Sequence, residues 1–274
     1  MRIPRWQNVI FLICFALLLN ACSNLPPEPA VEKGVVLKMT YDFKEAGRPQ
    51  QEYALYVPTN YQHGKPTPLV VLLHALSGDP QGVMAYEGIT AQAEKHGMIV
   101  VAPFGYNEGG WYGSRGNGKD FGSPMLNRFA DGAPDNLGEL SEIDVLNVLN
   151  LTRKQFTVDP KRIYLAGHSM GGGGVLYLGI KYARTWAALA AMAPSFYGDP
   201  AQITEIRTMP IIVAHGDKDT LIPVARTRQW VEQMNRLDMN YQYIEIADGD
   251  HLRAINKNPG LITLVFNFLN EQHK

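Results

Sequence analysis

The residues with the clearest chemical potential surround Ser169. The segment Gly-His-Ser-Met-Gly at 167–171 follows an apolar run at 163–166 and precedes three more glycines and a helical pattern. A sharp turn from a strand into a helix projects the serine oxygen outward, and glycines at the flanking positions permit the close backbone approach that such a turn demands. The helix that follows directs its N–H groups toward the place where negative charge develops. We therefore predict that Ser169 is a covalent nucleophile.

A serine hydroxyl is a weak nucleophile, so it needs a base, and the base needs an orienting carboxylate. After this type of serine turn, the acid and then the histidine follow along the chain, on loops after later strands. Only His251 and His273 follow both Ser169 and the strand patterns at 211–214 and 241–246. His273 is the penultimate residue, so we predict that His251 is the base.

Chain order does not single out the carboxylate. Asp217, Asp219, Asp248 and Asp250 all lie on the loops that follow these two strand patterns. Asp217 also suits a turn, and Asp250 suits a loop or a helix cap. The residue pattern alone leaves four candidates.

The elements that position these loops alternate between strand-like and helix-like patterns, which indicates a mostly parallel sheet with helices on both faces. Residues 69–73 form a continuous apolar run, as expected of a strand buried on both sides. The other predicted strands are 35–41, 52–57, 99–102, 163–166, 187–193, 211–214 and 241–246, and the predicted helices are 89–96, 140–156, 172–183, 225–237 and 261–272. We predict a single α/β domain over residues 35–274.

Two segments resemble a known superfamily. His-Gly-Asp-Lys-Asp-Thr-Leu-Ile-Pro at 215–223 resembles the acid loop of the α/β-hydrolases, and this resemblance places the acid at Asp219. The segment at 158–172, Val-Asp-Pro-Lys-Arg-Ile-Tyr-Leu-Ala-Gly-His-Ser-Met-Gly-Gly, is similar to the compact esterase branch. That branch includes polyhydroxybutyrate depolymerases, feruloyl and acetylxylan esterases and the prolyl-oligopeptidase catalytic domain. The resemblance extends over residues 69–251 and implies an α/β-hydrolase fold.

The same resemblance implies an oxyanion hole. Its donors are the backbone N–H of Met170 and, on the loop at 74–78, the backbone N–H of Leu76, with Ala75 as the alternative donor. The family's His-Gly-x motif has a glycine where this chain has Ala75. Alanine resists backbone conformations that glycine permits. The backbone conformation of Ala75 therefore tests whether this loop can form the oxyanion hole.

One long connection interrupts the alternation of strands and helices. Residues 105–138 are rich in Gly, Asn, Asp and Pro, and they contain Trp111 and Tyr112. A connection of this length inside a compact domain is usually functional. We predict that Trp111 and Tyr112 line a substrate cleft; the alternative is that they pack the loop against the body of the protein.

The amino terminus has a targeting pattern. Two arginines precede a short apolar run at 9–19, which is typical of a signal peptide and too short to span a bilayer. Leu-Asn-Ala-Cys at 19–22 resembles the bacterial lipobox, which implies cleavage after residue 21 and lipidation of Cys22. The alternative is an ordinary secretory signal with an incidental cysteine.

Cysteine usage favours the lipid. Cleavage would leave Cys22 as the only cysteine, so no intrachain disulfide could form. Residues 22–34 contain three prolines and no apolar periodicity, which is typical of an extended tether. Ser23 resembles the residue that directs lipoproteins to the outer membrane. We therefore predict a lipid-anchored protein of a bacterial cell envelope, in the outer membrane.

Composition excludes several other functions. A net charge of −1 over 274 residues gives no electrostatic case for binding nucleic acid. No metal-ligand cluster, Walker loop or dinucleotide fingerprint is present, so we predict neither a metal nor a cofactor. The prediction is hydrolysis of a small-molecule or oligosaccharide ester through an acyl-enzyme on Ser169. The alternatives are a serine peptidase of the prolyl-oligopeptidase type and a non-catalytic binding lipoprotein.

Overall fold

The computed structural model describes residues 28–274, so the predicted signal peptide and Cys22 lie outside the described residues. Eight strands form at the eight predicted places. They are β1 (Val36–Phe43), β2 (Arg48–Tyr56), β3 (Thr67–Leu73), β4 (Ile99–Pro103), β5 (Val158–His168), β6 (Ala188–Met192), β7 (Ile211–Gly216) and β8 (Tyr241–Ile246).

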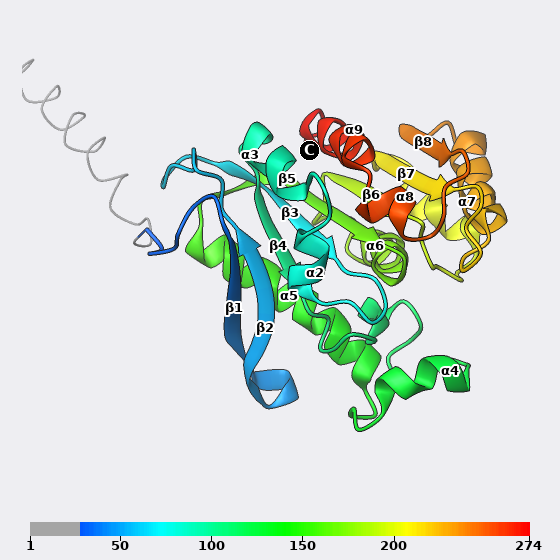
Figure 1. The fold of residues 1–274 in the computed structure, drawn as a ribbon, viewed down its shortest axis with the longest axis horizontal. Helices are drawn as coiled ribbons and strands as arrows, with labels where there is room; N and C mark the ends of the chain where they lie inside the picture. The colour runs from blue at the N-terminus through cyan, green and yellow to red at the C-terminus, as the bar shows by residue number, and fades with distance from the viewer. Residues whose placement is uncertain (1–27) are drawn as a thin grey trace, which may run out of the picture.

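These strands form one sheet in the order β1-β2-β4-β3-β5-β6-β7-β8 (Figure 1). β2 is antiparallel to both β1 and β4, and all other neighbours pair in parallel. Every residue of β3 is buried, as expected of a central strand covered on both faces. The sheet and its helices confirm the predicted α/β-hydrolase architecture in a single domain.

Five helices match the predicted ones, and the short helices were not predicted. The matching helices are α3 (Ile89–His96), α5 (Leu137–Gln155), α6 (Met170–Lys181), α7 (Val224–Arg236) and α9 (Pro259–Asn270). The short ones are α2 (Pro80–Met84), α4 (Pro124–Asn127) and α8 (Arg253–Asn256), with the 3-10 turns η2 (Lys44–Ala46), η3 (Trp111–Gly113), η4 (Arg128–Ala130) and η5 (Pro200–Ile206). Four or five residues are too few to produce a helical periodicity.

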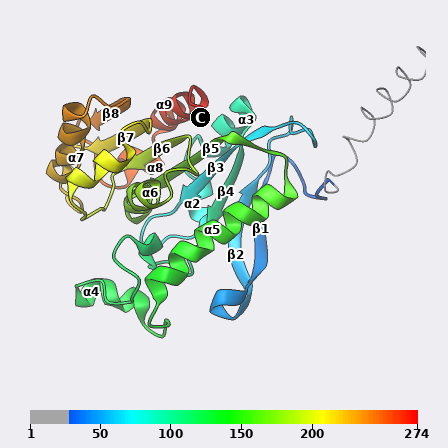
Figure 2. The same cartoon turned by 180° about the vertical axis from the view of Figure 1, so that it is seen from behind.

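The sheet separates two hydrophobic cores. Alternate residues of β4 face opposite sides, with Ile99 and Val101 in one core and Val100 and Ala102 in the other. Residues of α5, α6 and α7 fill the first core, and residues of α2, α3, α8 and α9 fill the second. Figure 2 shows α5 crossing the near face of the sheet, while Figure 1 shows α2, α3 and α9 on the opposite face.

The carboxyl ends of the parallel strands meet at one edge of the sheet. Leu73 at the end of β3 is in register with Gly167 of β5, and Gly216 of β7 is in register with Ile246 of β8. The loops that follow these strands therefore gather at this edge, where ligands bind in open α/β sheets.

The first described residues lie at the opposite edge. Val36 of β1 pairs with Tyr56 of β2, and Tyr56 pairs with Val100 near the start of β4. The backbone N–H of Gly34 donates to the carbonyl of Val57. The chain thus joins the sheet at the amino-terminal edge of the parallel strands. No helix within residues 28–274 is long and apolar enough to cross a bilayer.

Candidate active site

Ser169 occupies the sharp turn between β5 and α6. Its backbone, with a φ of 57° and a ψ of −114°, has a conformation that residues other than glycine rarely adopt. The neighbouring glycines make this turn possible. A Cβ on Gly171 would lie 2.3 Å from the carbonyl oxygen of Leu73, and a Cβ on Gly167 would lie 2.6 Å from the carbonyl carbon of Gly171. Strain of this kind is held at functional sites because the surrounding structure fixes the backbone.

Ser169, His251 and Asp219 form a continuous hydrogen-bonded chain. The Ser169 Oγ lies 2.7 Å from Nε2 of His251, and Nδ1 of His251 lies 2.5 Å from Oδ2 of Asp219. The three residues come from the β5–α6 turn, the loop after β8 and the loop after β7. Each is buried, with 6–8% of its surface exposed. The structure thus brings together the nucleophile, base and acid residues that the sequence indicated.

Asp219 is held as a carboxylate. Its Oδ1 accepts hydrogen bonds from the backbone N–H groups of Leu221 and Ile222, both at 2.8 Å. Burial raises the pKa of Asp219, but hydrogen bonds from the Ile222 N–H and from His251 outweigh it and hold this pKa below its ordinary value. An ionised Asp219 keeps the proton of His251 on Nδ1, so Nε2 is free to accept the proton of Ser169.

His215 supports Asp219 from behind and was not predicted as a site residue. Its Nε2 lies 3.0 Å from Oδ2 of Asp219 and 2.9 Å from the carbonyl of Ile222, so this nitrogen carries the proton. Its Nδ1 lies 2.7 Å from the hydroxyl of Thr227, which donates to it. Burial lowers the pKa of His215 and favours this neutral form. The sequence signal was the histidine that opens the acid loop.

His168 connects the nucleophile strand to the loop of the base. Its Nε2 donates to the backbone carbonyl of His251 at 2.9 Å, and its Nδ1 accepts from the hydroxyl of Tyr86 at 2.8 Å. Burial lowers the pKa of His168 to about 3, so it is neutral in this arrangement. This neutral link fixes the backbone of the base relative to Ser169.

The rival aspartates have other surroundings. Asp250 accepts hydrogen bonds from the backbone N–H groups of 252–254 and so caps the start of α8. Asp248 is exposed, and Asp217 is half-buried with one carboxylate oxygen unpaired. Among these four candidates in the described chain, only Asp219 has a carboxylate that is hydrogen-bonded to the His251 ring.

The loop after β3 lies beside Ser169. Ala75 and Leu76 line the same cavity as Ser169 and His251, and Met170 begins α6. On this loop Ser77 has a positive φ of 60°. Ala75 is not among the described non-glycine residues with a positive φ. Alanine at position 75 therefore needs no glycine-like backbone, which removes the difficulty that the departure from the family motif raised.

The cavity at Ser169 has a volume of about 390 Å³. Its apolar lining residues include Leu76, Met125, Leu126, Phe129, Leu221 and Leu252. Met125, Leu221 and Leu252 are among the few large apolar side chains that the described chain exposes. Trp111, Arg115 and Tyr197 also line this cavity. Sequence analysis missed Arg115 and Tyr197, because neither belongs to a motif.

The two aromatic residues predicted to line the cleft have different roles. Trp111 lines the cavity, whereas Tyr112 is fully buried and does not, so the prediction is corrected for Tyr112. The backbone N–H of Tyr112 donates to Ser141 on α5, and its hydroxyl accepts from the backbone N–H of His74 at 3.1 Å. Tyr112 therefore packs the long loop against the body and holds the start of the loop after β3.

The described residues hold no group of three or more His, Cys, Asp or Glu side chains that could bind a metal ion. Residues 48–253 match the model of the family named Esterase. The chain belongs to the Esterase family. Its Ser–His–Asp arrangement and its α/β-hydrolase sheet are the features expected of a serine ester hydrolase of this family.

Several known proteins are similar to this Esterase-family chain. S-formylglutathione hydrolase of Rattus norvegicus is 28% identical over 148 residues, which are 53% of this chain and 52% of the relative. The chain thus spans about half the length of this curated relative. Two solved structures share the fold, each over most of both chains. The serine hydrolase FphF of Staphylococcus aureus has a TM-score of 0.66 at 17% identity, covering 88% of this chain and 100% of that one. The ferulic acid esterase AmCE1/Fae1A of Anaeromyces mucronatus has a TM-score of 0.64 at 18% identity, covering 90% of this chain and 93% of that one.

Proposed function

We propose that this protein hydrolyses carboxylic esters through an acyl-enzyme on Ser169. The Ser169 oxygen attacks the ester carbonyl carbon while Nε2 of His251 takes the hydroxyl proton, and Asp219 stabilises the resulting imidazolium. The backbone N–H groups of Met170 and Leu76 stabilise the oxyanion. His251 then passes the proton to the departing alcohol. Water, deprotonated by His251, releases the carboxylic acid and restores Ser169.

The observation that carries this proposal is the hydrogen-bonded chain at the strained turn beside a cavity. A packing role for Ser169 would require neither the positive φ nor a buried histidine 2.7 Å from its hydroxyl. Such a constellation is recognised by its geometry and roles.

A fluorophosphonate probe tests the proposal directly. We expect the probe to attach stoichiometrically to Ser169, with the modified peptide identified by mass spectrometry, because an activated serine attacks phosphorus as it attacks a carbonyl. Ser169→Ala should abolish labelling, whereas Ser123→Ala, which changes a half-buried serine that does not line the cavity, should be labelled normally. Absence of labelling in the folded wild-type protein would contradict the proposal.

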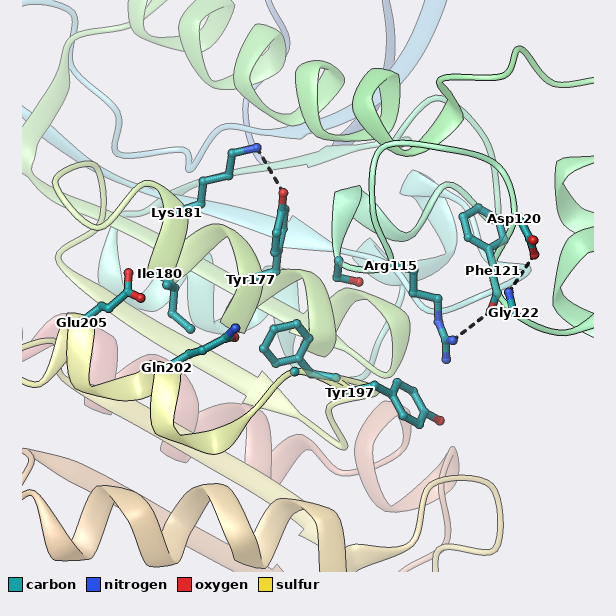
Figure 3. Close-up of a pocket in the computed structure, with 13 residues that line it drawn as sticks. Arg115, Asp120, Phe121, Gly122, Tyr177, Ile180, Lys181, Tyr197, Gln202 and Glu205 are labelled. Carbon is teal, nitrogen blue, oxygen red and sulfur yellow. Dashed lines mark hydrogen bonds between the residues drawn. The ribbon is translucent and has the colours of Figure 1, made fainter.

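The substrate class that we propose is a small-molecule or oligosaccharide ester. A second cavity of about 720 Å³ adjoins the first, and Arg115 and Tyr197 line both. Figure 3 shows Arg115 and Tyr197 at one end of this cavity and Gln202 and Glu205 at the other. Aromatic side chains beside polar ones suit a sugar or an aromatic ring. The solved ferulic acid esterase AmCE1/Fae1A in complex with ferulic acid supports a substrate of this kind.

We also propose that a lipid on Cys22 anchors the protein in the outer membrane of a bacterium. The support for this proposal is the lipobox-like segment at 19–22 and the proline-containing tether. Two acyl chains or more make a membrane anchor stable, whereas a single chain gives marginal binding.

Replacement of Cys22 by alanine should release the protein from membranes and leave the hydrolysis of esters by the purified protein unchanged. The reason is that the described domain joins the tether at the edge of the sheet opposite Ser169. Fractionation of cells that express each form, followed by detection of the protein in membrane and soluble fractions, measures the effect. Membrane attachment of the alanine variant at the wild-type level would refute the lipid anchor.

A further inference from the structure

Within the described chain, the catalytic cavity is lined by basic side chains and by no acidic ones. Arg115 and Arg128 line this cavity, and no aspartate or glutamate of the described chain does. Arg226 of α7 adds a third guanidinium, 4.3 Å from the ring centre of Tyr197. Within residues 28–274, none of these three arginines has a carboxylate oxygen within 4 Å. These arginines therefore form no ion pair within the described chain.

Arg115 is fixed in place without being neutralised. Its guanidinium lies 4.0 Å from the ring centre of Trp111 and 4.3 Å from that of Tyr197, and Nη1 donates to the carbonyl of Phe121 at 3.2 Å. Its Nε is buried and has no hydrogen-bond partner. Asp120 lines the adjoining cavity, but its carboxylate accepts from the backbone of Gly122 and from a side-chain amide and forms no ion pair with Arg115.

Two neutral donors that line the same cavity are also unpaired. Nε1 of Trp111 and Oγ of Ser195 are buried without a hydrogen-bond partner, and each residue is only 3% exposed. Buried donors in native proteins are nearly always paired, so unpaired ones beside a cavity are available to an acceptor on a bound ligand or to a water molecule. Trp111 is held in the left-handed region, with a φ of 59°, and such strain is typical of ligand-binding segments.

We propose that the catalytic cavity selects esters that carry a carboxylate group, and that Arg115 binds this carboxylate. The inference rests on the proposed ester hydrolysis and names the class of ester. A guanidinium presents a planar fork of N–H donors that matches a carboxylate, and the Nε that lacks a partner belongs to that fork. Apolar residues that line the same cavity, such as Leu76, Phe129 and Leu221, lower the local dielectric and so strengthen the ion pair.

Two matched pairs of esters test which half of the substrate reaches Arg115. The first pair is 4-acetoxybenzoate and 4-acetoxybenzamide, in which the alcohol half is charged or neutral. The second pair is 4-nitrophenyl hydrogen adipate and 4-nitrophenyl methyl adipate, in which the acyl half is charged or neutral. The ratio of kcat/KM within a pair is compared between variants, so the intrinsic reactivity of each ester cancels.

Arg115→Gln should lower the charged-to-neutral ratio by about 10- to 100-fold in one of the pairs, mainly through a higher KM for the charged ester. Arg115→Lys should retain part of the preference, because it keeps the charge but loses the fork. Arg236→Gln is the matched control, because Arg236 is exposed and paired with Glu232 on α7, and it should leave both ratios unchanged. Unaltered melting temperatures would show that the variants fold.

A second readout does not depend on turnover. Calorimetry on Ser169→Ala should detect binding of the preferred charged ester, and the additional Arg115→Gln substitution should weaken that binding by a similar factor. If neutral esters are hydrolysed and neither ratio changes in Arg115→Gln, the inference is overturned while the proposed function stands. If the wild-type protein hydrolyses none of the four esters, the proposed function itself is overturned.

Discussion

Ser169→Ala and His251→Ala are each expected to lower kcat by about 10⁶-fold, because loss of either residue disables the transfer of the hydroxyl proton on which attack depends. The structural basis is the 2.7 Å contact between Ser169 Oγ and His251 Nε2. The double variant should be hardly slower than either single variant, since a base without its nucleophile has nothing to activate. Steady-state hydrolysis of a chromogenic short-chain ester by the purified variants measures all three values.

The non-additivity is the discriminating result. If the two losses multiplied, the residues would act independently, and the hydrogen-bonded chain would not be the catalytic unit. A Ser169→Ala variant with wild-type activity on every ester tested would remove the basis of the proposed function.

Asp219→Asn should lower kcat by about 10⁴-fold, less than the loss of the nucleophile or the base. The amide cannot stabilise the imidazolium, and it favours the wrong tautomer of His251, yet both reacting groups remain. The variant also loses the carboxylate that accepts hydrogen bonds from His215 and from the Ile222 N–H. The same ester assay, together with a thermal melt to exclude unfolding, measures the effect.

Asp217→Asn and Asp250→Asn are the matched controls for charge. Asp250 caps α8, so Asp250→Asn retains an oxygen for the N–H groups of 252–254 and should keep nearly full activity. If Asp250→Asn or Asp217→Asn were inactive while Asp219→Asn remained active, the acid would be a different aspartate, and the fold would be unaffected.

Those parts of the fold that depend on local patterns followed from the sequence. Continuous apolar runs such as 69–73 fixed the central strands, and glycine spacing fixed the turn at Ser169. The choice among four aspartates needed the resemblance to a superfamily, because all four lie on two loops of similar composition. Burial and the hydrogen bond to the His251 ring distinguish Asp219, and neither can be read from a loop sequence.

The long loop at 105–138 was the part that sequence reasoning could not resolve. Its conformation depends on distant contacts, such as the Asp144 carboxylate on α5 accepting from the backbone N–H of Gly105 at 2.6 Å. Such contacts decide that Trp111 lines the cavity while its neighbour Tyr112 is buried. Arg115 lies on the same loop and lines the cavity, and it belongs to no motif, so no spacing rule could have found it.

The first described residues lie at the edge of the sheet opposite Ser169, and this determines how the protein can be attached to a support. A bilayer, a resin bead or a fused carrier joined ahead of residue 28 meets the amino-terminal edge and leaves the cavity mouth unobstructed. Fully extended, residues 22–35 span at most about 50 Å. A protein held in this way would reach substrates only within that radius, and a shorter tether would reduce its range without altering its chemistry.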